Sequence, residues 1–209
     1  MGETRCESED MPATIHAGAQ FRWHEELCRI QVPRLREVAI RGGRALAPGH
    51  LPHKGGVYCF WWTGDRALLS DPTCNRVIEL RGPGGRIVRL ELDDEWLGLR
   101  TDLPIPLYVG KAADSIAKRV GQHLRLAIDR VTLTFEGHCK QARPTTSCQV
   151  RAGIEHFFPQ LHNSRDLVLD HIGLSFVILD GDEHSADRFY LEDLAVGLMR
   201  PPLNVDIER

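Results

Sequence analysis

The feature that most restricts the fold is a short run of aromatic and β-branched residues at positions 56–62, GVYCFWW. Such a run favours a buried strand, because these side chains pack well on a pleated surface and lose little freedom there. Residues 172–179 and 106–111 (PLYVGK) predict two further strands. Residues 76–80 and 86–92 flank a Gly-Pro-Gly-Gly turn and predict a β-hairpin.

The segments between and after these strands have residue patterns that predict helices. Asp114 or Ser115 can cap a helix, and apolar residues recur behind it at helical spacing. Pro201-Pro202 stops the last helix. Short strands in alternation with helices predict an α/β (α+β) fold. The expected helices are residues 21–40, in two pieces interrupted at Pro33, then 114–130, 145–156 and 186–199.

Glycine and proline mark a boundary near residues 45–54. The first ten residues carry four acids against one arginine and lack the apolar run of a signal peptide. We therefore expect a disordered acidic tail over residues 1–20, an N-terminal helical arm over 21–54 and a globular domain over 55–209. No apolar stretch approaches the ~20 residues that a bilayer requires, so we expect no membrane partner and a cytoplasmic protein.

The charge is unevenly distributed along the chain. The net charge is −3, yet residues 100–151 hold nine basic against four acidic residues, a local charge of +5. A second basic stretch lies in the N-terminal arm. Basic clusters of this kind occur on solvated helix faces, and they also suit binding to the phosphate backbone of a nucleic acid. The candidate nucleic-acid-binding residues are Arg34, Arg36, Arg41, Arg44, Lys118 and Arg125.

Six cysteines occur without a CxxC pair and without the density of a disulfide scaffold, so reduced thiols are expected. His138, Cys139 and Cys148 could supply three zinc ligands for an interaction domain, although their spacing matches no standard zinc pattern. A loop with ordinary thiols is the simpler interpretation.

Two places put polar side chains in apolar surroundings. Glu192 lies among Phe189, Val196 and Met199 on a helical wheel, and a carboxylate in such a stripe needs a paired charge or a metal ion. Arg119 and His123 are four residues apart, so they share one helix face. An arginine and a histidine on one face suit phosphate binding and proton transfer. Taken alone, Tyr58 and Tyr108 are more typical of core aromatics. In the same way, Arg119 and His123 taken alone are more typical of a solvated arginine and a capping histidine.

The order of these residues resembles the GIY-YIG nuclease family. Gly56-Val57-Tyr58 and Tyr108-Val109-Gly110 stand where the family has its two tripeptides, and the segment LYVGKA at 107–112 is similar to its restriction-enzyme branch. The resemblance covers residues 56–204. It implies a small central antiparallel sheet flanked by helices, with the two motif strands as neighbours. The tyrosines are fifty residues apart here, so residues 63–104 must form a β-hairpin insertion between these strands.

The resemblance also implies a metal-dependent endonuclease that hydrolyses DNA, with restriction or phage defence as the leading role. A structure-selective repair or recombination nuclease and a non-catalytic nucleic-acid-binding module are the alternatives. Recognition would come from the insertion, the N-terminal arm or a second protomer in a homodimer. In the implied site, Glu192 holds Mg²⁺ (or Mn²⁺), Tyr58 is the general base and Arg119 clamps the phosphate. His123, Tyr108 and Lys111 position water or phosphate or assist proton transfer, and Asn204 orients its neighbours by hydrogen bonds.

Overall fold

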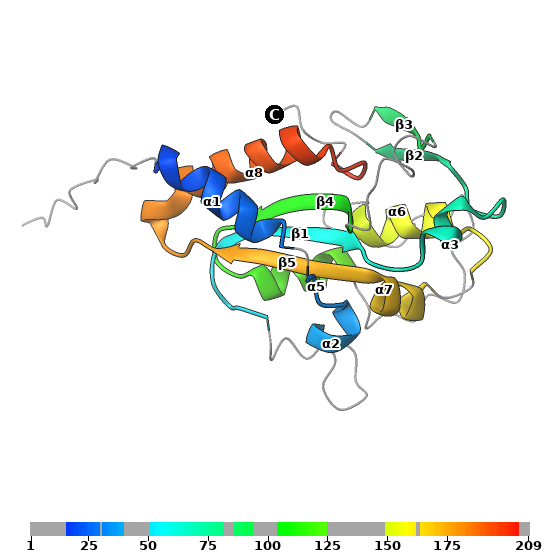
Figure 1. Cartoon of the computed structure of the whole chain (residues 1–209), viewed down its shortest axis with the longest axis horizontal. Coiled ribbons are helices and arrows are strands. Elements are labelled where there is room, and N and C mark those ends of the chain that lie inside the picture. Colours follow the sequence, from blue (N-terminus) through cyan, green and yellow to red (C-terminus); the bar gives the residue numbers. More distant parts are fainter. Residues whose placement is uncertain are drawn as a thin grey trace, which may run out of the picture.

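The computed structural model describes residues 16–29, 31–39, 51–81, 86–93, 104–124, 149–161 and 164–204. At its centre is a three-stranded antiparallel sheet of strand order β4-β1-β5 (Figure 1). The strands are β1 (Gly56–Trp62), β4 (Ile105–Ala112) and β5 (Ile172–Ile178). With helices packed on this sheet, the protein is an α+β protein, as the alternation of strand and helix signals predicts.

Strand β1 is the central strand, and every one of its residues is buried, so both of its faces are covered. Successive side chains of a strand point to opposite faces, and the two apolar clusters of the protein divide β1 in this way. One cluster contains Val57, Cys59 and Trp61, and the other contains Tyr58, Phe60 and Trp62.

Two helices from opposite ends of the chain cover the first face. They are α1 (Ala17–Leu27) and α8 (Ser185–Met199), and the latter follows a 3-10 turn, η3 (Asp182–His184). Figure 1 shows them side by side over the sheet, with α1 in blue and α8 in orange to red. Leu27 and Leu191 are fully buried in the same cluster as Val57. The N-terminal helix is therefore part of the core.

The second face carries the remaining large helices. These are α5 (Ile116–Leu124), α6 (Gln149–Phe157) and α7 (Arg165–His171), with α2 (Leu35–Ala39) packed against α7. Ser115 begins α5 by accepting a hydrogen bond from the Lys118 backbone N–H with its side chain, at 3.2 Å. This is the capping that the sequence predicts.

The segment between β1 and β4 contains the predicted hairpin. Strands β2 (Val77–Arg81) and β3 (Ile87–Glu91) pair with each other in a separate two-stranded sheet, after a short helix α3 (Arg66–Ser70). The insertion leaves the main sheet intact. Tyr58 of β1 stands opposite Gly110 of β4, so the expected antiparallel pairing of the two motif strands is confirmed.

The expected tail boundary at residue 20 differs from the structure, since α1 begins at Ala17. Gln20 is buried, and its side chain donates to the Asp187 carboxylate at 3.1 Å, so the start of α1 is in contact with α8. Residues 1–15 and 40–50 lie outside the described residues. Across the described ranges, no helix has both the length and the apolarity that a membrane crossing demands.

Candidate active site

Five of the predicted site residues come together at the β4 edge of the sheet, from four elements. Tyr58 extends from β1, Tyr108 from β4, Arg119 and His123 from α5, and Glu192 from α8. The Tyr58 hydroxyl lies 2.8 Å from His123 Nε2, and the Tyr108 ring centroid lies 4.7 Å from that of His123. Arg119 hydrogen-bonds Tyr58, and the Glu192 charge acts on the same phenol.

Gly110 makes this arrangement possible. A side-chain carbon at position 110 would lie only 2.6 Å from the Tyr58 hydroxyl oxygen and 2.8 Å from the Tyr108 ring. Contacts this short are not tolerated between unbonded atoms, so only glycine lets the Tyr58 ring cross over β4 here. The position of Tyr58 therefore requires a glycine at residue 110, the last residue of the Tyr108-Val109-Gly110 tripeptide.

The Tyr58 hydroxyl lies between Arg119 and His123. A guanidinium group only donates, so the Tyr58 oxygen accepts from Arg119, whereas the direction of the hydrogen bond to His123 Nε2 follows the tautomer of the ring. A Tyr58 O–H that donates to Nε2 requires the ring proton of neutral His123 on Nδ1, for which the described residues provide no hydrogen-bond partner. Tyr58 is the middle member of a chain from Arg119 to His123.

Burial sets the protonation of this pair. Desolvation, and secondly the charge of Tyr108, raise the pKa of Tyr58, while Arg119 acts in the opposite direction. Desolvation and the Arg119 charge lower the pKa of His123 to about 3. Both groups are therefore neutral near pH 7 in the folded protein. To act as the general base that the resemblance implies, Tyr58 would need a lowered pKa. Added positive charge near its hydroxyl would therefore be needed before Tyr58 could lose its proton.

The predicted metal ligand is half of an ion pair. The Glu192 carboxylate binds the Lys111 ammonium group, whose nitrogen also lies 4.7 Å from the centre of the Phe189 ring. The glutamate side chain is 12% exposed and the lysine side chain 23%, so the pair lies just beneath the surface. Lysine occupies one oxygen of a carboxylate that offers about four acceptor positions. A hard cation that also binds a substrate phosphate fits the remaining positions, because Mg²⁺ commonly uses one or two protein carboxylates.

Asn204 contacts the backbone of β4. Its side chain accepts a hydrogen bond from the Val109 N–H at 2.8 Å and donates to the Val109 carbonyl at 2.7 Å. A strand at the edge of a sheet has unpaired backbone groups, and the amide of Asn204 satisfies both groups of this residue. It thereby holds Tyr108 and Gly110, the two neighbours of Val109, in place. These two hydrogen bonds are the contacts through which Asn204 would exert the orienting role that the resemblance implies.

The predicted nucleic-acid-binding residues that the structure describes lie apart and make different contacts. Arg36 donates to both Asp166 and Asp170 of α7, whereas Arg34 lines an open pocket with Trp62 and Arg66 at the far end of β1 from Tyr58. Lys118 is exposed and lies 3.6 Å from Asp114. Outside the described residues lie the other three predicted basic residues and the three predicted zinc ligands, namely Arg41, Arg44, Arg125, His138, Cys139 and Cys148.

One polar cluster is absent from the sequence-based predictions. His16, His184 and Asp187 meet where α1 lies beside the start of α8. His184 and Asp187 are three residues apart, which is a helical spacing, but His16 is 171 residues from Asp187. Only the packing of α1 on α8 brings them together. In comparisons with known proteins, the chain matches no protein-family model, no curated protein and no solved structure.

Proposed function

We propose that the protein is a metal-dependent endonuclease of the GIY-YIG type, which hydrolyses phosphodiester bonds of DNA. One observation carries the proposal: Tyr58, Tyr108, Arg119, His123 and Glu192 lie around one phenol, although they come from four elements. The pairing of the two motif strands next to α5 and α8 also supports it, since the family's fold has that arrangement. A role in restriction or phage defence is our leading biological interpretation.

Each residue has a part in this reaction. Arg119 donates to a phosphate oxygen, because a guanidinium fork matches phosphate geometry. Glu192 would hold a divalent cation, and Lys111 adds a positive charge close to that carboxylate. When bound, such an ion would supply positive charge that neutralises the phosphate and eases the loss of a proton from nearby groups. Tyr108 packs against His123 and keeps its ring in place.

A neutral phenol cannot take a proton from water, so Tyr58 can act as the base only as a phenolate. In this proposal the positive charges of Arg119, Lys111 and the bound cation would lower the Tyr58 pKa, and the phenol proton would be lost to solvent water. His123, whose Nε2 lies 2.8 Å from the Tyr58 hydroxyl, stays neutral and positions that group. Arg119 stabilises the phenolate by its hydrogen bond. The phenolate then accepts a proton from the attacking water, and the water oxygen bonds to phosphorus. The bond from phosphorus to the 3′-oxygen breaks, which gives a 5′-phosphate and, after that oxygen takes up a proton, a 3′-hydroxyl.

A non-catalytic nucleic-acid-binding module is the competing function, and specific features favour it. Tyr58 is fully buried, His123 is 1% exposed, and Glu192 is already paired with Lys111. These features describe a closed site. In the nuclease proposal, DNA and the cation must separate Glu192 from Lys111 or bind to both.

The test is incubation of the protein with supercoiled plasmid, four-way branched DNA and RNA, with Mg²⁺ or with a chelator, followed by sequencing of any new ends. Magnesium-dependent cleavage of the plasmid with 5′-phosphate ends supports the proposal. Cleavage confined to branched DNA supports the repair or recombination role instead. Binding of DNA without cleavage under all conditions would contradict the nuclease proposal and favour the binding module.

A further inference from the structure

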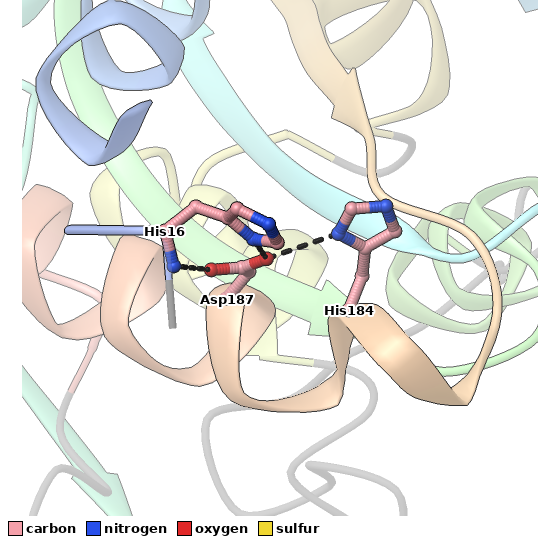
Figure 2. Close-up of side chains that lie close together, drawn as sticks. All are labelled: His16, His184 and Asp187. Carbon is pink, nitrogen blue, oxygen red and sulfur yellow. Dashed lines mark hydrogen bonds and ion pairs between the residues drawn. The ribbon is translucent and has the colours of Figure 1, made fainter. Parts of the chain in front are cut away.

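A second cluster of ligating side chains lies away from the candidate active site, where the start of α1 lies beside the start of α8. Figure 2 shows His16, His184 and Asp187 with both imidazole rings directed at one carboxylate. His16 Nδ1 lies 2.8 Å and His184 Nδ1 lies 3.0 Å from the same oxygen, Asp187 Oδ2. The three ligand atoms all lie within 4.8 Å of one another.

We propose that His16, His184 and Asp187 form a binding site for a divalent transition-metal ion, with zinc as the best fit. Two imidazole nitrogens and one carboxylate oxygen are ligands that zinc commonly takes, and three protein ligands leave a fourth position for water. Ligands at the usual zinc distances and tetrahedral angles lie about 3.3 Å apart. The two separations from nitrogen to oxygen, 2.8 and 3.0 Å, therefore need a small widening to admit the ion, and the two imidazole nitrogens lie within 4.8 Å of each other.

The surroundings of Asp187 resemble the outer shell of a metal site. Its other oxygen, Oδ1, accepts from the His16 backbone N–H at 3.0 Å and from Gln20 Nε2 at 3.1 Å. These two donors fix the carboxylate and leave Oδ2 for the ion, as hydrogen bonds to ligating carboxylates do. Trp23 meets both imidazole rings edge-on with centroids 6.3 Å apart, which restrains their orientation.

The charge balance admits a cation at Asp187. The Asp187 side chain is fully buried, and among the described residues its partners include no lysine or arginine. A buried carboxylate is stable when a positive charge or several donors compensate it, and a metal ion would take the place of the two imidazole partners of Oδ2 in doing so. His16 and His184 are 50% and 30% exposed, so the ion and its water can enter from solvent.

The alternative is a simple hydrogen-bonded latch, in which both imidazoles donate Nδ1–H to Oδ2. The two states differ in the position of the ring protons, because a metal ion requires a lone pair on each Nδ1 and places each N–H on Nε2. In the metal-bound state, the ion joins His16, just before α1, to α8. The expected consequence is a more stable attachment of the N-terminal helix.

The test uses Co²⁺ as a spectroscopic probe and Zn²⁺ as competitor on the full chain. We expect one equivalent of Co²⁺ with visible bands of a four-coordinate nitrogen and oxygen site, and displacement by Zn²⁺. His16→Gln and His184→Gln should each weaken binding at least ~10-fold. Glu192→Gln should leave this binding unchanged, which separates the site from the proposed catalytic cation.

His24→Gln is the matched control on α1. Its ring lies 3.5 Å from the Cys28 sulfur, and burial raises the pKa of that thiol to about 11, so the thiol is a poor ligand. Binding should persist in this variant, without the sulfur-to-cobalt bands that a Cys28 site would give. Zinc at 100-fold excess over its Kd should also raise the Tm of the wild-type protein by several degrees. Absence of saturable binding and of a Tm shift, or equal binding in both His16→Gln and His184→Gln, would overturn the proposal.

Discussion

His123 is uncharged in the folded protein because burial, and then the Arg119 charge, lower its pKa to about 3. In the unfolded chain the same imidazole titrates near its ordinary value of about 6.5. Between these two values the unfolded state binds a proton that the folded state does not. The folding stability therefore falls as the pH drops from about 6.5 towards 3, by about 1.4 kcal/mol per pH unit from this one group.

We predict that His123→Gln removes this pH dependence. From pH 7 to pH 5, the wild-type protein should lose about 2 kcal/mol more unfolding free energy than the variant does. Urea unfolding of both proteins at the two pH values measures the difference. Equal losses would show that His123 is protonated or exposed in the folded protein.

Gly110 gives a second prediction at the residue scale. An alanine there must displace the buried Tyr58 ring, so Gly110→Ala should lower cleavage more than ten-fold and destabilise the fold by about 1–3 kcal/mol. Gly121→Ala is the matched control, since a side chain at this helical glycine meets nothing within 4 Å. It should be neutral or stabilising by about 0.5–1 kcal/mol. Similar losses in both variants would contradict the proposed close approach of Tyr58 to β4.

Helix α1 illustrates what the sequence does and does not determine at the scale of elements. The two helical pieces on either side of Pro33 are predicted from the sequence, but their packing is not, because α1 pairs with α8 from the other end of the chain. Helices α3 and α7 are missing from the predictions. They have five and seven residues, too short to form without the tertiary contacts that bury Leu69, Val168 and Leu169.

The packing of α1 leads to a stability prediction. Leu27→Ala should cost about 2–5 kcal/mol of unfolding free energy, because Leu27 is fully buried against β1 and α8. Phe21→Ala on the same helix should change stability by less than about 0.5 kcal/mol, because Phe21 is 64% exposed. Urea unfolding compares them. If the two variants unfolded alike, α1 would not be part of the core.

For the whole molecule, the sequence predicts the strands and their pairing better than it predicts how deeply the site residues are buried. The strands and the hairpin follow from local composition, and the convergence of Tyr58 and Glu192 follows from the resemblance. The burial of Tyr58 and His123 depends on α5 and α6 covering the sheet, which no local pattern specifies. The cluster around Asp187 was missed because His16 carries no local signal of its distant partners.

The distribution of charge yields a prediction about DNA affinity. Each phosphate contact contributes about −0.9 to the slope of log affinity against log salt. Arg36→Ala should leave this slope unchanged, because Asp166 and Asp170 already hold its guanidinium group. Arg34→Ala should make the slope shallower by about 0.9. Fluorescence anisotropy over a salt series measures both slopes, and a reversed pattern would contradict the proposed phosphate contact of Arg34 and favour one by Arg36 beside α7.

The central claim is that Glu192 holds the cation of a nuclease site. The most direct measurement compares Glu192→Gln with Asp193→Asn, a change of the exposed neighbouring acid on α8, in magnesium-dependent plasmid cleavage and in DNA binding. We predict that Glu192→Gln abolishes cleavage while DNA affinity is retained or rises, because one negative charge is lost, and that Asp193→Asn cleaves normally. Cleavage by Glu192→Gln at the wild-type rate and the same Mg²⁺ concentration would contradict the account.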